Sequence, residues 1–216
     1  MQTHNKRDFD AVAATWDEKP ARVRLAREVT AAILRQVQLS HHMAALDYGC
    51  GSGLVTLGIQ PYVKRIVGAD SSREMLEMLT RKVQVQGIKN VSARLIDLTC
   101  RESLENDFDL IVSSMTMHHV CDVAAMIATF VRVLKPGGWL ALADLEAEDG
   151  SFHDDPTGVC HHGFERGFMH ALLTEKGCFD VRVIPATTVR KETPVGEERL
   201  YPVFLAVGRT RVQHVS

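Results

Sequence analysis

The stretch AALDYGCGSG, residues 44–53, decides the fold that we expect for this chain. Its first five residues are mostly apolar and suit a short buried strand, and Gly49, Gly51 and Gly53 follow within five positions. Glycine lets the backbone turn tightly and approach a ligand, and a helix behind such a turn offers free N–H groups. The stretch therefore predicts a ligand-binding turn between a strand and a helix. A tight turn without a ligand is the alternative.

Strand-like and helix-like segments alternate outward from this stretch. The pattern predicts strands at residues 44–48, 65–69, 91–96, 108–113, 139–145, 179–184 and 202–209, and helices at 52–59, 71–85, 123–134 and 164–176. Such alternation indicates an α/β fold with a parallel sheet covered on both faces. Nothing helical lies between residues 184 and 202, so the last two strands are expected to be antiparallel neighbours at one edge.

The boundaries of these segments carry their own signals. The first forty residues show helical periodicity, and Pro20 suits the first turn of a helix. Ser71 or Ser72 is expected to cap the helix that follows, with Glu74 completing a capping box. Residues 135–138, KPGG, are expected to form a turn.

The bulk composition narrows the class of protein. The chain has 216 residues, 45% hydrophobic and 24% charged, with a formal net charge of -2, which suits one globular domain. There is no basic excess, so no nucleic-acid partner is expected. The start of the chain lacks an apolar signal region, and no apolar run is long enough to cross a membrane. The five cysteines are scattered and form no CxxC pair. We therefore expect a reduced, cytoplasmic protein without membrane contact, either a monomer or a homodimer.

The charge beside the glycines separates two kinds of ligand. A dinucleotide-binding turn has the spacing GxGxxG, whereas this one reads GxGxG with Asp47 two residues ahead of the first glycine. A carboxylate there would repel a pyrophosphate and attract a cationic amino or sulfonium group. The pattern therefore favours a cationic ligand.

With these residues in view, D-x-G-x-G-x-G resembles motif I of the class I S-adenosylmethionine (SAM)-dependent methyltransferases. The resemblance continues in order through VGADSS, LIDLT, FDLIVSSMTMHHV and VLKPGGWLALAD, and covers roughly residues 44–145. The sequence MHHV is most similar to the small-molecule group that includes ubiquinone and menaquinone (type 11) methyltransferases. The resemblance implies a three-layer αβα fold, a doubly wound and mostly parallel seven-stranded sheet of order 3-2-1-4-5-7-6 with strand 7 antiparallel. It also implies a helical cap over the cofactor at residues 1–40 and a SAM-binding domain at 41–216.

By the same resemblance, a set of residues would bind SAM. They are Trp16, Asp47, Gly49, Cys50, Gly51, Gly53, Asp70, Ser71, Met75, Asp97, Leu98, Ser113 and Ser114. Asp70 follows the second strand, where a carboxylate accepts hydrogen bonds from a ribose diol; capping the next helix is the alternative. Asp97 would accept from the adenine amino group, with the N–H of Leu98 facing the ring, unless it is a surface carboxylate.

The other expected contacts concern the methionine end and the adenine face. Backbone carbonyls of Ser113 and Ser114 would hold the methionine amino group, and Asp47 would act at the same end. Met75 would lie against adenine or belong to the core. Trp16 lies in FDAVAATWDEKP, which resembles the family's YDxxAxxYD opening, and would cover the cofactor or pack a helix.

His118 and His119 follow the fourth strand, beside the expected methyl group. A histidine suits a general base for a hydroxyl, thiol or acidic carbon, although one imidazole could instead have a structural role. Strand alternation predicts that only one of the pair faces the pocket. We favour His118 as the catalytic candidate and keep His119 as a substrate-side candidate.

The segment 146–164 is a long polar loop that leaves the carboxyl end of the fifth strand, and loops of this length tend to be functional. We expect a lid on the substrate side. Its substrate-side candidates are His153, His161 and His162. A metal site built from His118, His153, Asp154 and His161 is conceivable. No pair has the H-x3-H spacing of a helical site, so no metal is expected.

The expected activity is transfer of a methyl group from SAM to a small soluble acceptor, leaving S-adenosylhomocysteine (SAH). Residues 114–117, SMTM, differ from the D/N/S-P-P-Y/F motif that marks methylation of exocyclic amines. Oxygen, sulfur, carbon and nitrogen acceptors all remain open. Two other functions are considered: a SAM-binding accessory protein without turnover, and an NAD(P)-dependent oxidoreductase, whose Tyr-x-x-x-Lys set the sequence lacks.

Overall fold

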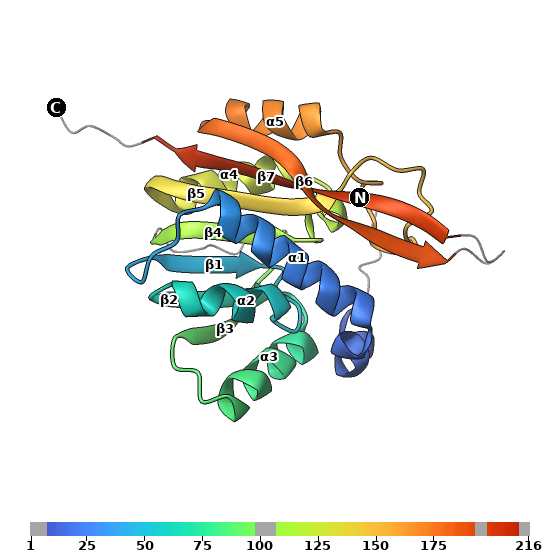
Figure 1. The fold of residues 1–216 in the computed structure, drawn as a ribbon, viewed down its shortest axis with the longest axis horizontal. Helices are drawn as coiled ribbons and strands as arrows, with labels where there is room; N and C mark the ends of the chain where they lie inside the picture. The colour runs from blue at the N-terminus through green and yellow to red at the C-terminus, as the bar shows by residue number, and fades with distance from the viewer. Residues whose placement is uncertain (1–7, 98–106, 193–197, 212–216) are drawn as a thin grey trace.

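A computed structural model describes residues 8–97, 107–192 and 198–211 of the chain. A central sheet organises them (Figure 1). Its strands are β1 (Ala44–Tyr48), β2 (Arg65–Asp70), β3 (Val91–Leu95), β4 (Phe108–Ser114), β5 (Leu134–Leu145), β6 (Cys178–Glu192) and β7 (Glu198–Thr210). The order is β3-β2-β1-β4-β5-β7-β6. The first five strands in this order are parallel, and β7 is antiparallel to both β5 and β6. The α/β class and the expected strand order are confirmed.

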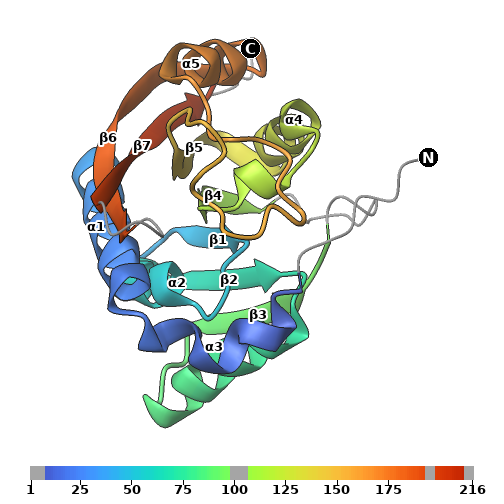
Figure 2. The same cartoon turned by 90° about the vertical axis from the view of Figure 1, so that its right-hand side faces the viewer.

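Helices cover both faces of the sheet (Figure 2). They are α1 (Pro20–Gln36), α2 (Leu54–Ile59), α3 (Arg73–Val85), α4 (Val123–Val133) and α5 (Arg166–Glu175), with 3₁₀ turns η1 (Asp10–Glu18), η2 (Gln60–Tyr62) and η4 (Met117–His119). Neighbouring strand residues face opposite ways. Leu46 and Ile111 join one apolar cluster with α4 and α5, whereas Ala45 and Val112 join another with α1 and α2. This alternation is the period-two pattern of a sheet buried on both sides.

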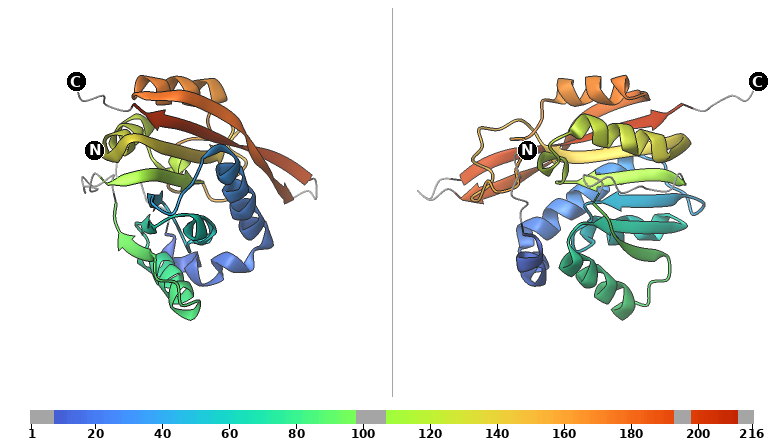
Figure 3. Two further views of the ribbon diagram at one scale, coloured as in Figure 1. Left: turned by 60° about the vertical axis from the view of Figure 1, so that its left-hand side comes forward. Right: turned by 180° about the vertical axis from the view of Figure 1, so that it is seen from behind.

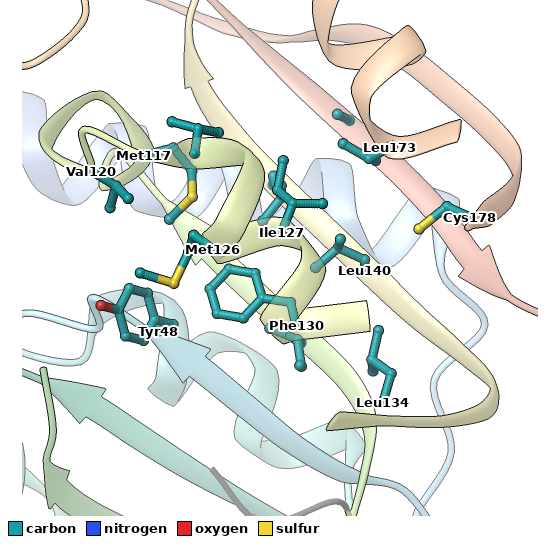
Figure 4. Close-up of a cluster of buried hydrophobic side chains, with 14 of the residues drawn as sticks. Tyr48, Met117, Val120, Met126, Ile127, Phe130, Leu134, Leu140, Leu173 and Cys178 are labelled. Atoms are coloured by element: carbon teal, nitrogen blue, oxygen red, sulfur yellow. The ribbon is translucent and has the colours of Figure 1, made fainter. Parts of the chain in front are cut away.

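The cluster under α4 is the more aromatic of the two cores. Phe130 of α4 lies edge-on to Tyr48 at the end of β1, with ring centroids 5.3 Å apart (Figure 4). Met126 lies beside Tyr48, and Leu140 of β5 is packed into the same cluster. Tyr48 directly precedes the glycine turn, so this core fixes the point at which that turn leaves the sheet.

Three local expectations need correction. Residues 135–138 are part of β5 rather than a turn between elements, because Leu134 already pairs with Phe108 before the ladder shifts register. Thr210 bridges this irregular stretch by binding both its N–H and carbonyl groups. Ser72 is the N-cap of α3, accepting from the N–H of Met75 at 3.2 Å. The third helical position is therefore Met75 instead of Glu74, and no capping box forms. The hairpin strands β6 and β7 extend well beyond the lengths expected.

The two N-terminal elements lie in different places. Helix α1 begins at Pro20 as expected and buries Val29 and Ile33 in the sheet core. The turn η1 instead lies beside α3 (Figure 2), where Asp10 accepts hydrogen bonds from the hydroxyl of Ser72 and the N–H of Glu74. Thus η1 is attached to the start of α3, next to the carboxyl ends of β1 and β2.

Candidate functional site

The three positions after β1 require glycine for different structural reasons. Their φ angles are +70°, +53° and +85° in chain order. A Cβ on Gly49 would lie 2.3 Å from Thr116, and one on Gly53 would lie 2.4 Å from a leucine of α3, so packing alone requires both. A Cβ on Gly51 would meet nothing closer than the sulfur of Met75 at 3.9 Å. Gly51 is therefore the glycine whose backbone a ligand can approach.

Asp70, at the end of β2, is held by the glycine turn. One carboxylate oxygen accepts the N–H of Gly51 at 2.8 Å, and the other accepts the N–H of Ser72 at 2.9 Å. A carboxylate has about four lone-pair sites, so two backbone donors do not exhaust it. The capping role that competed with ligand binding belongs to the side chain of Ser72. Asp70 is thus oriented at the position where the resemblance expects ribose.

Asp47, in the middle of β1, is a buried carboxylate. Its side chain is 1% exposed and accepts a hydrogen bond from the hydroxyl of Thr56 at 2.6 Å. Burial raises the pKa of Asp47 to about 7, and the charge of Asp70 adds to this, against the opposing hydrogen bond from Thr56. A cation arriving nearby would restore the charged form. Asp47 is therefore a buried carboxylate, two residues before the glycine turn, whose charge depends on the groups around it.

Three other predicted cofactor residues, Cys50, Met75 and Ser71, lie in or near the glycine turn and the start of α3. Cys50 is packed with Leu79 in a small apolar cluster, and burial, followed by the charges of Asp47 and Asp70, raises the pKa of its thiol well above the usual value. Only its main chain is suited to a ligand contact. Met75 is 1% exposed, with its sulfur beside Gly51. Ser71 is partly buried, directly before the cap of α3.

Asp97 follows β3 and is partly buried. Its strand is held against β2, since the N–H of Ile96 donates to the carbonyl of Asp70 at 2.9 Å. Asp97 thus lies next to the end of the strand that carries Asp70. Leu98, the expected adenine contact, lies outside the described residues.

The end of β4 approaches the glycine turn. The buried hydroxyl of Ser113 donates to the carbonyl of Tyr48 at 2.7 Å. The hydroxyl of Thr116 donates to the carbonyl of Ser114 at 3.1 Å. Between them, Met115 has φ +56°, in the left-handed region that non-glycine residues seldom adopt. Such backbone strain is found at functional sites, and nothing in the sequence signals it here.

The turn η1 closes over the glycine loop through one carboxylate. Asp17 accepts from the hydroxyl of Ser52 at 2.5 Å and forms an ion pair of 2.5 Å with Lys82 of α3. Trp16, the predicted cover, has the guanidinium of Arg22 3.6 Å from its ring centroid. Sequence analysis named Trp16 but missed Asp17, although this aspartate is the last residue of the match to the YDxxAxxYD opening.

His118 is held by a carboxylate that sequence analysis also missed. The Nδ1 of its ring lies 2.6 Å from Oδ1 of Asp144, and its backbone N–H donates to Oδ2 of the same carboxylate at 3.2 Å. Each of the two residues is 1% exposed. Burial raises the pKa of Asp144, but the His118 imidazole and backbone N–H donors outweigh burial, and the net pKa lies below its usual value. Asp144 therefore acts as the buried carboxylate partner of this imidazole.

His119 and His153 lie beside His118. The ring centroids of His119 and His153 are 4.2 and 4.9 Å from that of His118, and 5.5 Å from each other. Phe9 lies edge-on to His119 at 5.3 Å. The expectation that only one of the adjacent histidines faces the site relied on strand alternation, which does not apply because both residues lie in the 3₁₀ turn η4.

The loop 146–164 is anchored to the long hairpin. The hydroxyl of Ser151 bonds that of Tyr201 in β7 at 2.8 Å, and Lys191 of β6 binds both the carbonyl of Phe152 at 2.6 Å and Asp154 at 2.8 Å. In Figure 3 this loop lies beside the ends of β6 and β7. These contacts fix the path of an irregular segment along the hairpin.

The other lid residues that we considered lie away from the histidine cluster. His161 bonds the carbonyl of Val120 through Nε2 at 3.1 Å. His162 is exposed, with its Nδ1 3.6 Å from Glu148. Asp154 pairs with a lysine, as described above. The metal set considered from the sequence is therefore not brought together: of its three loop members only His153 lies beside His118, and His119 completes the histidine cluster.

A disulfide joins Cys121, just after η4, to Cys160 in the lid. The N–H of Cys160 also donates to the carbonyl of His118 at 2.9 Å. The expectation of reduced cysteines is wrong for this pair. Cysteines separated by 39 residues give no spacing signal, and only the path of the lid brings them together.

No helix among the described residues is long and apolar enough to cross a membrane.

A surface hollow lined by Leu134, Cys178 and Thr210 lies at the opposite end of β5 and contains none of the predicted site residues.

Comparisons with known proteins agree with this arrangement. Residues 46–142 match a family model described as a methyltransferase domain. The chain is 33% identical over 135 residues to an uncharacterized methyltransferase of Schizosaccharomyces pombe, covering 56% of this chain and 48% of that protein. It is 25% identical over 148 residues to the ubiquinone biosynthesis O-methyltransferase of Thiobacillus denitrificans, covering 67% and 63%.

A solved structure shows the same fold. The SAM-dependent methyltransferase of Aquifex aeolicus superimposes with a TM-score of 0.69 and is 21% identical, with 94% of this chain and 99% of that chain covered. The chain spans about half the length of the S. pombe relative, so that match establishes a shared domain rather than a shared substrate. Together, the family model and the relatives identify residues 46–142 as a methyltransferase domain, and the fold is shared with a SAM-dependent methyltransferase.

Proposed function

We propose that this protein transfers the methyl group of SAM to a small-molecule acceptor held between the glycine turn and the histidine cluster. One observation carries the proposal: the buried pair of His118 and Asp144 lies at the same edge of the sheet as Asp70 and the glycine turn. Thr116, just before η4, connects the histidine pair to the glycine turn, since its hydroxyl contacts the carbonyl of Gly49 at 3.4 Å.

The glycine side would bind the cofactor. Asp70 accepts from the ribose hydroxyls, and the bare backbone at Gly51 allows close approach. The ammonium group of the methionine end would favour the charged form of Asp47. Closure of η1 through Asp17 excludes water from the sulfonium centre.

The histidine side would receive the acceptor. The nucleophile attacks the methyl carbon in line with the C–S bond, whose electrons stay on sulfur and give SAH. Orientation and desolvation supply most of the rate. His118, oriented by Asp144, takes the proton of a nucleophile that carries one. This feature favours a hydroxyl or thiol acceptor, and the name of the T. denitrificans relative, an O-methyltransferase, favours a hydroxyl.

A methyl-release assay tests the proposal. The full chain is incubated with SAM and a library of small hydroxyl and thiol compounds, and SAH is measured. We expect SAH to form with at least one acceptor and to fall in His118→Ala, while His170→Ala, which changes an exposed histidine of α5, behaves as the wild type. Tight SAM binding without SAH from any acceptor would instead support an accessory protein.

A further inference from the structure

Three histidines converge where the proposed acceptor would lie. His118, His119 and His153 each offer a ring nitrogen, and these three atoms all lie within 4.8 Å of one another. Two of them come from the turn η4 and the third from the lid, 34 positions farther along the chain than His119. Methyl transfer with a single base needs only one imidazole, so the other two have no role in the reaction described above.

Hydrogen bonds on the far side of two rings fix which nitrogen is available. The Nδ1 of His119 lies 2.8 Å from the carbonyl of Gly158, which can only accept, so that nitrogen carries the proton. The Nδ1 of His118 faces the carboxylate of Asp144 at 2.6 Å and is likewise the donor. In the neutral rings both lone pairs are then on Nε2. Metal-binding histidines are oriented in this way by a carboxylate or a carbonyl behind the ring.

The chemistry of the cluster selects one class of ion. Imidazole nitrogen suits Zn²⁺ and other divalent transition metals, whereas Ca²⁺ and Mg²⁺ require oxygen ligands. Three imidazoles carry no charge when neutral, and the buried carboxylate of Asp144 offsets part of the charge of a divalent ion. Three protein ligands also leave a fourth tetrahedral position open.

We propose that His118, His119 and His153 bind a divalent transition-metal ion, Zn²⁺ first, with an open position toward the methyl-acceptor site. At Zn–N distances of about 2.0–2.1 Å, tetrahedral ligand atoms lie about 3.4 Å apart. Binding therefore draws the three nitrogens closer together. His153 makes this adjustment, because it lies in an irregular loop, whereas hydrogen bonds hold the two rings of η4.

The disulfide supports the same assignment. Cys121 follows η4 directly and Cys160 belongs to the lid, so their bond ties the lid to the turn that carries two of the ligands. The backbone N–H groups of Cys160 and His161 also donate to the carbonyl of His118 at 2.9 and 3.1 Å. The third ligand thus comes from a segment that is anchored to the other two.

The metal proposal rests on the proposed acceptor site, but its test is independent of methyl transfer. Metal binding is measured without SAM, so either proposal can be refuted while the other holds. With a metal bound, Nε2 of His118 is a ligand, and the ion takes over activation of the acceptor. A hydroxyl at the open position loses its proton to solvent because the cation lowers its pKa. Its oxygen then attacks the methyl carbon as before.

Cobalt titration tests the proposal. The full chain, with any affinity tag removed and treated with a chelator, is titrated with Co²⁺, and the visible ligand-field bands are recorded. We expect one Co²⁺ per chain in tetrahedral geometry, displaced by Zn²⁺. Removing a partner behind a ligand costs about 10–100-fold in affinity, so His153→Ala, which removes a ligand, should weaken binding by about 100-fold or more.

Matched variants separate this site from others. His162→Ala changes an exposed histidine of the same lid and should leave Co²⁺ affinity unchanged. Changing both Cys121 and Cys160 to serine should retain the bands, because thiolates are not ligands. Circular dichroism checks that each variant is folded. Absence of Co²⁺ binding, or equal affinity in His153→Ala and the wild type, would overturn the proposal.

Discussion

The carboxyl edge of the sheet has two halves that are built differently. The half over β1 and β2 uses backbone groups and carboxylates, with Gly51 and Asp70 joined by a hydrogen bond of 2.8 Å. The half over β4 and β5 uses imidazoles, with His118 bonded to Asp144 and the lid packed beside them. The first half is suited to binding a cofactor and the second to activating an acceptor. Changes in the two halves should therefore affect different measurements.

The largest expected effect is in the histidine half. His118→Ala should lower kcat by about 10²–10⁴-fold, the contribution of a positioned acid or base, while SAM affinity stays unchanged. Initial rates of SAH formation at saturating SAM measure the first quantity, and calorimetry measures the second. Wild-type turnover in this variant would remove His118 from the mechanism, and a loss of SAM affinity would contradict the division into halves.

The next effect concerns the buried carboxylate of the cofactor half. The pKa of Asp47 is about 7 in the folded protein against an ordinary value of 3.8, so the folded state binds the proton more tightly than the unfolded chain. The stability that this provides is full below about pH 4 and is lost as the pH rises through 7. The difference of about three pH units corresponds to about 4 kcal/mol.

Asp47→Asn should therefore raise the free energy of unfolding by up to about 4 kcal/mol at pH 8.5 and by much less at pH 4. Urea unfolding at both values measures this. The same variant should bind SAM more weakly at pH 8.5, because the neutral amide does not attract the ammonium group. An equal change in stability at the two pH values would show that Asp47 does not titrate as described.

A smaller effect is expected for the ribose contact. Asp70→Ala should weaken SAM binding by about 1–3 kcal/mol, the usual loss for hydrogen bonds to a charged group. Calorimetry measures it, with Glu77→Gln on the exposed side of α3 as the matched control. Unchanged affinity in Asp70→Ala would place the cofactor elsewhere.

The smallest expected effect is at the cover of the cofactor half. Asp17→Asn removes the charge that pairs with Lys82, and the pair is partly exposed. It should lower the free energy of unfolding by about 1 kcal/mol at most. Urea unfolding measures the change, and Glu18→Gln, at the exposed neighbouring position, serves as the control. A loss as large as that of Asp70→Ala in SAM affinity would show that closure of η1, more than ribose binding, controls the cofactor.

The two halves also differ in how far the sequence predicts them. The glycine turn and Asp70 were predictable because one short motif and the end of the next strand place them. The alternation of strands and helices predicts a mostly parallel sheet, and the resemblance to the methyltransferase family supplies its strand order. Asp144 was not predictable, since in the sequence it is only a polar residue near the end of a buried strand. Its contact with His118 depends on the register between β4 and β5 and on the turn η4.

The lid was the least predictable part. Its length and composition indicated function, but the partners of its residues depend on the path of an irregular chain. His153 joins the cluster while His161 and His162 do not, and Cys160 meets Cys121. None of these pairings has a periodic pattern, because hydrogen bonds to β6 and β7 set the path of the loop.

The central claim is that the glycine half binds SAM, and the most direct test is a calorimetric titration of the unmodified chain with SAH and, separately, with NADH. A carboxylate close to a GxGxG turn should attract the ammonium group of SAH and repel a pyrophosphate. We predict one SAH bound per chain and no heat of binding with NADH. Binding of NADH without binding of SAH would contradict the account.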